Sequence, residues 1–130
     1  MTLVLDVSAA AAVVFREPDA FRVLPHLLAA RRVRVPQLFH LELANVGRTK
    51  VRRGEIDWRN ARRLLGTTQA WPIEIVAAPW QRVWSLARTH GLTTYDAAYL
   101  WLARRDRGKL LTLDRDLAAA AGSRSLLVFP

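Results

Sequence analysis

Short apolar runs alternate along this chain with longer segments of helical pattern, and this alternation constrains the fold more than any other feature. The run at residues 3–7 is almost continuous and of strand length, which is typical of a central strand buried on both faces. Similar strands are predicted at residues 33–35, 71–76, 109–113 and 126–129. Strands that alternate with helices predict an α/β fold of three α/β/α layers with a mostly parallel central sheet.

The helices expected between these strands begin and end at residues that favour helix termini. Ser8, Asp57 and Thr94 are predicted N-caps, and Pro36 is predicted to occupy a first helical position. Pro25 falls inside a predicted helix and is expected to bend or break it. No repeat or linker interrupts the pattern, so residues 1–130 are expected to form a single domain.

Composition narrows the class of protein. The sequence contains no cysteine, which excludes disulfides and thiolate-bound metal and is consistent with a reducing compartment. The N-terminus lacks the basic segment of a signal peptide, and no apolar run approaches the ~18 residues that a membrane span requires. We therefore expect a cytoplasmic protein.

The chain is strongly basic, with 20 Lys and Arg against 11 Asp and Glu and a net charge of +9. Almost all of this charge is arginine, whose planar guanidinium group matches phosphates and carboxylates. A nucleic acid or an acidic protein partner is therefore one explanation, and a genome-wide preference for Arg over Lys is the other. The largest local excess lies at residues 48–63, where an exposed, solvated helix face is the alternative to binding. The RNA-binding residues predicted there are Arg48, Arg52, Arg53 and Arg59.

Two acidic residues follow predicted strands. Asp6 closes the first strand and Asp114 closes the strand that begins at Lys109. Binding sites of open parallel sheets lie beyond the carboxyl ends of the strands, so these two carboxylates are expected to share one crevice. Taken singly, each is better explained as an acid at a helix N-terminus.

Two further acids are predicted on largely apolar helix faces. Glu42 lies in a stripe with Leu38 and Val46, and Asp96 lies one turn into a helix of similarly apolar pattern. An ionised carboxylate in apolar surroundings needs a partner, which is either a metal ion or one of the many arginines. For Asp96, compensation of the helix dipole is a further alternative.

As a set, the four acids point to metal chemistry. Four carboxylates brought close together repel one another unless a multivalent cation neutralises them. A set of hard oxygen ligands without His or Cys favours Mg²⁺ or Mn²⁺. Such an ion can activate a water molecule for attack on a phosphodiester, and the arginines would bind the nucleic acid.

Four local motifs resemble those of the PIN-domain family, and within it the VapC-type toxins, along nearly the whole chain. They are the opening strand with Asp6 and Ser8, the helix with Glu42 and Asn45, the segment Thr-Tyr-Asp-Ala around Asp96, and the Thr112-Leu-Asp114 strand end. The segment around Asp96 is the most specific of the four. Their order and separations strengthen the resemblance.

The resemblance implies a metal-dependent endoribonuclease that acts as the toxin of a type II toxin–antitoxin pair. Its metal ligands or their close supports would be Asp6, Glu42, Asp96 and Asp114, with Ser8 and Thr112 as hydrogen-bonding supports. It further implies Mg²⁺ or Mn²⁺ as the cofactor, RNA as the substrate, a small antitoxin protein as the partner, and a homodimer.

Three alternatives compete with this interpretation. A phosphotransferase with an aspartyl nucleophile is disfavoured because Ser8 occupies the place where such phosphatases carry a second Asp. A nucleotide-binding Rossmann or P-loop protein is disfavoured because the glycine motifs of neither fold appear. A non-catalytic RNA- or DNA-binding module with structural acids predicts no dependence on divalent metal. Asp116 is either part of the acidic pocket or a solvated acid in a first helical turn, which we favour.

Overall fold

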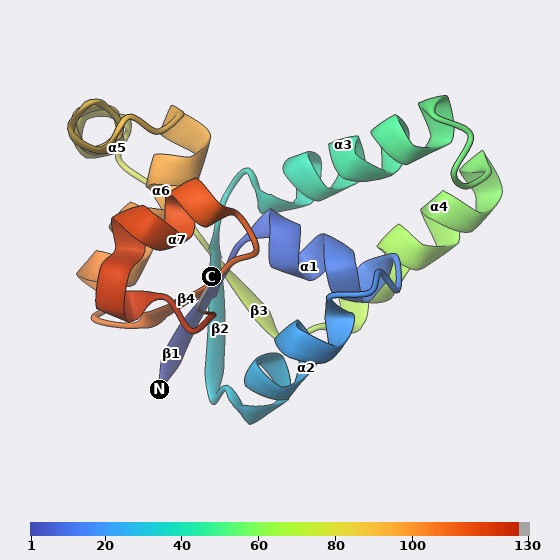
Figure 1. Ribbon diagram of the computed structural model, residues 1–130, viewed down its shortest axis with the longest axis horizontal. Helices are drawn as coiled ribbons and strands as arrows, with labels where there is room; N and C mark the ends of the chain where they lie inside the picture. Colours follow the sequence, from blue (N-terminus) through green and yellow to red (C-terminus); the bar gives the residue numbers. More distant parts are fainter. Residues whose placement is uncertain (128–130) are drawn as a thin grey trace.

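The computed structural model describes residues 1–127, and its centre is a four-stranded sheet (Figure 1). The strands are β1 (Thr2–Leu5), β2 (Arg32–Pro36), β3 (Ile73–Val76) and β4 (Lys109–Leu111), in the order β3-β2-β1-β4. Each neighbouring pair is parallel. The structure therefore confirms the predicted α/β fold with a parallel sheet.

Helices cover both faces of this sheet. They are α1 (Val7–Val14), α2 (Ala20–Ala29), α3 (Phe39–Arg52), α4 (Trp58–Gly66), α5 (Trp80–His90), α6 (Thr94–Arg105) and α7 (Arg115–Ala121). Figure 1 shows α1 to α4 on one side of the sheet and α5 to α7 on the other, with α3 and α4 extending away from it as an arm. These are the three layers that the sequence pattern predicted.

The topology of the sheet defines where a site should form. The chain passes from β1 outward to β2 and β3, then returns to place β4 on the other side of β1. The strand order therefore reverses between β1 and β4. In open parallel sheets, the crevice at this point, beyond the carboxyl ends of the strands, is where ligands bind.

The core is centred on β1 and α6. The side chains of Leu3, Val4 and Leu5 are fully buried, as a strand covered by helices on both faces requires. Helix α6 packs against β1, β2 and β4. Before β4 the backbone of Gly108 approaches β1 so closely that a Cβ there would lie 2.6 Å from the Thr2 carbonyl oxygen.

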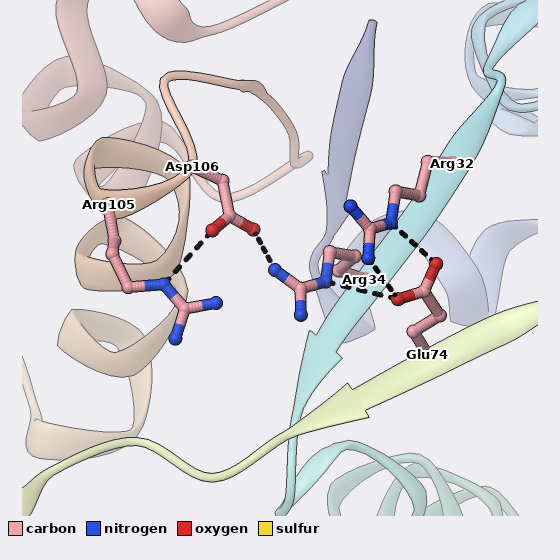
Figure 2. Close-up of polar contacts among 5 residues, drawn as sticks. All are labelled: Arg32, Arg34, Glu74, Arg105 and Asp106. Carbon is pink, nitrogen blue, oxygen red and sulfur yellow. Dashed lines mark hydrogen bonds and ion pairs between the residues drawn. The ribbon is translucent and has the colours of Figure 1, made fainter.

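An ion-pair network fixes the end of α6 to the sheet (Figure 2). Arg34 of β2 donates to Asp106 Oδ2 at 2.7 Å, and Arg105 donates to Oδ1 of the same carboxylate at 3.0 Å. Arg32 donates to both carboxylate oxygens of Glu74 on β3, at 2.6 and 2.8 Å. Because Arg34 also lies 3.4 Å from Glu74, the network joins α6, β2 and β3.

Three predicted helix starts were wrong by one to three residues. Asp6, not Ser8, is the N-cap of α1, because the Ser8 hydroxyl is engaged in hydrogen bonds with Asp6 and β4. Thr93, not Thr94, caps α6. Pro36 ends β2 instead of starting a helix, since it pairs with Val76 and the next N–H, of Gln37, still donates to Val76.

Other expectations had mixed outcomes. Asp57 caps α4 as predicted, and Pro25 lies inside α2 without breaking it. The strand predicted at 126–129 does not form at residues 126 and 127, since only the preceding Ser125 makes an isolated parallel bridge with Leu110, and residues 128 and 129 lie outside the described residues. Within residues 1–127 no helix is both long and apolar enough to cross a lipid bilayer.

Candidate active site

The ends of β1 and β4 bring Asp6 and Asp114 to the same edge of the sheet. Leu5 pairs with Leu111 in the ladder, and the Asp6 N–H continues it by donating to the Leu111 carbonyl oxygen at 3.0 Å. Both carboxylates also cap helices, since Asp6 Oδ2 accepts from the Ser8 N–H and Asp114 Oδ1 from the Leu117 N–H. The two explanations offered by the sequence, strand-end acid and helix cap, therefore hold together.

The carboxylate of Asp6 is buried and is held through one of its two oxygens. Its Oδ2 accepts from the Ser8 hydroxyl at 2.5 Å, the Ser8 N–H at 3.3 Å and the Thr112 hydroxyl at 2.7 Å. All three hydrogen bonds fall on Oδ2, which leaves Oδ1 for another ligand. Burial raises the pKa of Asp6, and the hydrogen bonds from Ser8 and Thr112 oppose that rise.

The hydroxyls of Ser8 and Thr112 are oriented by backbone groups. The Ser8 hydroxyl oxygen accepts from the Leu113 N–H at 2.9 Å, and that of Thr112 accepts from the Asp114 N–H at 3.0 Å. Because a hydroxyl carries only one proton, these backbone donors direct both protons toward Asp6. The two residues thus join the ends of β1 and β4 and fix the Asp6 side chain.

Glu42 reaches the same region from the first turn of α3. Its Oε1 accepts a hydrogen bond from the Tyr99 hydroxyl at 2.9 Å, and Tyr99 itself is fully buried on α6. Burial is the main cause that raises the pKa of Glu42, followed by the charges of Asp6 and Asp96, while the Tyr99 hydrogen bond lowers it. The hydrogen-bond partner of Glu42 is therefore a neutral hydroxyl, and not an arginine, which was one of the two partners that the sequence allowed.

Asp96 completes the group from the first turn of α6. The Thr93 hydroxyl caps that turn by accepting from the Asp96 N–H at 3.1 Å. The pKa of Asp96 is raised to about 6, chiefly by burial and additionally by the charges of Asp6 and Asp114. Each of the four predicted acids therefore lies within electrostatic range of at least two of the others.

None of these four carboxylates takes part in the ion pairs found among residues 1–127. Those ion pairs lie at Asp19, Glu74, Asp106 and around Lys50. As the side chains stand, no three acidic or histidine residues among those described lie close enough to enclose a metal ion. A bound cation would have to draw the carboxylates together and would relieve their repulsion.

The family follows from comparison with known proteins. The family model described as PIN domain matches residues 3–123 of the chain. The chain belongs to the PIN-domain family.

Relatives in this family are similar along nearly their whole length. The chain is 35% identical over 122 residues to Ribonuclease VapC3 of Pyrobaculum aerophilum, covering 91% of this chain and 93% of the relative. It is 30% identical over 118 residues to Ribonuclease VapC9 of Mycobacterium tuberculosis, covering 89% and 88%.

Two solved structures share the fold. The crystal structure of PAE2754 from Pyrobaculum aerophilum matches with a TM-score of 0.77 and 25% identity, covering 96% of this chain and 83% of the other. Mycobacterium tuberculosis VapC20, described as a sarcin-ricin loop cleaving toxin, matches with a TM-score of 0.69 over 94% and 97% of the two chains. At 16% identity this second likeness shows the fold alone.

Two hollows lie along α3 of this PIN domain, one beside Glu42 and one between α3 and α4, which we call the arm groove. Leu41 and Asn45 line both the hollow that contains Glu42 and the neighbouring hollow that contains Arg48 and Arg62. Arg52, Arg53 and Arg59 are exposed farther along the arm. Since a helix rises ~1.5 Å per residue, Arg52 lies roughly 15 Å along α3 from Glu42.

Asp116 and the five tryptophans of the chain differ in burial. Asp116 is exposed in the first turn of α7, where its charge still contributes to the raised pKa of Asp96. Trp71 and Trp101 pack against the core, whereas Trp58, Trp80 and Trp84 are exposed. No role in the site was predicted for Tyr99, although it lies three residues after Asp96 on the same helix, which was the available signal.

Proposed function

We propose that this PIN-domain protein is a VapC-type endoribonuclease, the toxin of a type II toxin–antitoxin pair, and hydrolyses RNA at the acidic site. The observation that carries this proposal is the meeting of Asp6, Glu42, Asp96 and Asp114 at the strand-order reversal, outside the ion pairs that the described residues form with one another. A purely structural set of acids would be expected to pair with the abundant arginines. The relatives named ribonuclease support the same activity.

The donor set suits Mg²⁺ or Mn²⁺. It consists of carboxylate oxygens without a nitrogen or sulfur ligand, and Asp6 keeps Oδ1 free of hydrogen bonds from the described residues. Asp6 and Asp96 would hold the ion together with Glu42 and Asp114. When bound, the ion supplies an activated water and stabilises the charge that develops on the phosphate.

The residues of the chain itself prepare this site. Ser8 and Thr112 hold Asp6 Oδ2, so that the carboxylate cannot rotate away from the crevice. The arginines of the arm, from Arg48 on the groove to Arg52, Arg53 and Arg59 beyond it, bind the RNA phosphates.

The test is RNA degradation by the purified protein with and without metal. We expect cleavage with Mg²⁺ or Mn²⁺, none after chelation, and none by the variant Asp96→Asn. The matched control is Asp19→Asn, because Asp19 is an exposed helix-terminal acid whose charge is not among the causes that shift the pKa values of Asp6, Glu42 and Asp96. Cleavage that persists after chelation, or binding of RNA without any cleavage, would support the alternative of a non-catalytic nucleic-acid-binding module.

A small antitoxin is the expected protein partner. The arm groove places exposed Leu41 and Trp58 beside Arg48 and Arg62, which suits an amphipathic segment with acidic residues. Co-expression with the adjacent small gene should restore growth and yield a stable complex. Restored growth without a complex contradicts direct inhibition.

A homodimer is expected through a different face. The hollow beside the start of α5 and α6 contains exposed Trp80, Trp84 and Tyr95, and none of its described lining residues is charged. In a chain of net charge +9, such an uncharged apolar face is where two copies can meet without repulsion. Light scattering should give twice the mass of one chain, and Trp84→Glu should reduce it to a monomer.

A further inference from the structure

We propose that Tyr99 is a positioning residue of the acidic site, whose hydroxyl fixes the Glu42 carboxylate in the orientation that binds the metal ion. This inference rests on the proposed metal-dependent nuclease function and assigns a role to a residue that contacts neither RNA nor metal. Tyr99 acts through Glu42.

The geometry of the pair carries the argument. Tyr99 is one of the largest fully buried side chains, so its ring is held by the core. The hydrogen bond that its hydroxyl makes within the described chain is the one to Glu42 Oε1, at 2.9 Å. A buried phenol hydroxyl needs a hydrogen-bond acceptor, and the acceptor of Tyr99 is Glu42, an acid of the proposed site.

The hydrogen bond spans two elements of different layers. Glu42 lies in the first turn of α3 and Tyr99 lies on α6, which packs directly on the sheet. A free Glu side chain on the arm side would sample several rotamers. Anchoring Oε1 to the core removes that freedom and leaves Oε2 as the oxygen that can bind a cation.

The chemistry of the donor matters as much as its position. A phenol is protonated and uncharged at neutral pH, so Tyr99 donates its proton to Glu42 without bringing a charge to the site. A lysine or arginine in its place would neutralise Glu42 and repel the incoming cation. A neutral donor orients the carboxylate and keeps its negative charge for the metal.

The first experiment replaces the donor with a ring of the same shape. Tyr99→Phe and the control Thr89→Val, which removes an exposed hydroxyl from α5, are compared with the wild type by calorimetric titration with Mn²⁺. We expect Tyr99→Phe to weaken Mn²⁺ affinity about 10- to 100-fold, the range for partners that orient metal ligands, and Thr89→Val to leave it unchanged. Excess Mn²⁺ should restore kcat, while KM for RNA should change little.

The second experiment asks whether Tyr99 acts through Glu42. In a Glu42→Gln background, Tyr99→Phe should cause no further loss of Mn²⁺ affinity, because the oriented carboxylate is already gone. Glu42→Asp shortens the side chain out of reach of the hydroxyl while keeping its charge, and it should reproduce the loss without changing the ring. Equal losses in both backgrounds, or full affinity in both Tyr99→Phe and Glu42→Asp, would overturn the assignment.

Failure of the proposed function would look different. A wild-type protein that neither binds Mn²⁺ nor cleaves RNA would contradict the nuclease proposal before any variant is made. If the wild type binds and cleaves and Tyr99→Phe equals it, only the role of Tyr99 is refuted.

Discussion

The buried hydroxyl of Thr112 donates to Asp6 Oδ2 at 2.7 Å, and this bond joins residues 106 positions apart at the ends of two neighbouring strands. The same hydroxyl accepts from the Asp114 N–H at 3.0 Å. Thr112 therefore serves both strand-end acids at once. Its position couples the stability of the sheet to the geometry of the acidic site.

Removing this hydroxyl should destabilise the protein. Thr112→Val keeps the shape of the side chain but leaves Asp6 with one donor fewer and the Asp114 N–H without its acceptor. We expect a loss of about 1–3 kcal/mol in the free energy of unfolding, the usual cost of an unsatisfied buried polar group. Urea denaturation measures it, with Thr112→Ser as the control, and equal stability of the two variants would contradict the role of the hydroxyl.

The crowded acids should make the metal-free protein more stable in mild acid. The pKa of Asp96 is raised to about 6 from 3.8, because of burial first and the charges of Asp6 and Asp114 next. The folded state therefore binds protons more tightly than the unfolded state, and stability rises as the pH falls from above 6 toward 4. Urea denaturation in the presence of a chelator should show this rise between pH 7.5 and 5.

Neutralising one acid should have the same effect at neutral pH. Asp96→Asn removes the repulsion permanently, so it should stabilise the metal-free protein at pH 7.5 by about 1–2 kcal/mol, a figure reduced for solvent screening of a half-buried group. The same variant should abolish RNA cleavage. Reduced stability of metal-free Asp96→Asn at pH 7.5 would contradict the repulsion described for the acids.

Much of the fold was predictable because local sequence patterns indicate its strands and helices. The continuous apolar run of β1 and the strand-end positions of Asp6 and Asp114 indicated a parallel sheet with acids at its carboxyl edge. Helix starts were less certain, since Asp6 and Ser8 are both good caps and only the hydrogen bonds to β4 decide between them. A single sequence does not contain that tertiary information.

The partner of Glu42 was the least predictable part of the site. The sequence indicated that its carboxylate needed a partner and offered twenty basic residues as candidates. Tyr99, which donates the hydrogen bond to Glu42, lies 57 residues away in the sequence. The helical pattern alone predicts it to be an ordinary core residue. Only the packing of α6 on the sheet brings its hydroxyl to Glu42.

The ion pair between Arg34 and Asp106 should contribute stability that is lost in acid. Burial alone would raise the pKa of Asp106, but the hydrogen bonds and charges of Arg34 and Arg105 outweigh it and lower the pKa below 3.8. The stabilisation is therefore present above pH 3.8 and lost as the pH falls through the lowered value.

Asp106→Asn tests this directly, because it removes the charge from a largely buried pair while keeping an acceptor. Side-chain exposure is 17% for Arg34 and 11% for Asp106, so we expect a loss of about 1–3 kcal/mol at pH 7. The difference from the wild type should shrink at pH 3. The control Asp19→Asn breaks an exposed pair and should change stability by at most about 0.5 kcal/mol.

The arginines of the arm should determine how RNA binding depends on salt. Each phosphate neutralised by a cation releases counterions, so the logarithm of the association constant falls with the logarithm of salt concentration by about 0.7 per contact for a single strand. Arg48 and Arg59 are exposed on the arm, whereas Arg82 and Arg88 are exposed on α5, on the other side of the sheet (Figure 1). Two double variants, Arg48→Gln with Arg59→Gln and Arg82→Gln with Arg88→Gln, change the net charge equally.

Both salt slopes are measured by fluorescence anisotropy with a labelled mixed-sequence RNA, between roughly 50 and 200 mM KCl. The variants carry Asp96→Asn in addition, which prevents cleavage of the RNA. We expect the arm variant to reduce the slope by about 1.4 and the α5 variant to reduce it far less. Equal reductions would mean that net charge, not the arm, governs binding, and a larger effect of the α5 variant would place the RNA on the opposite side of the sheet.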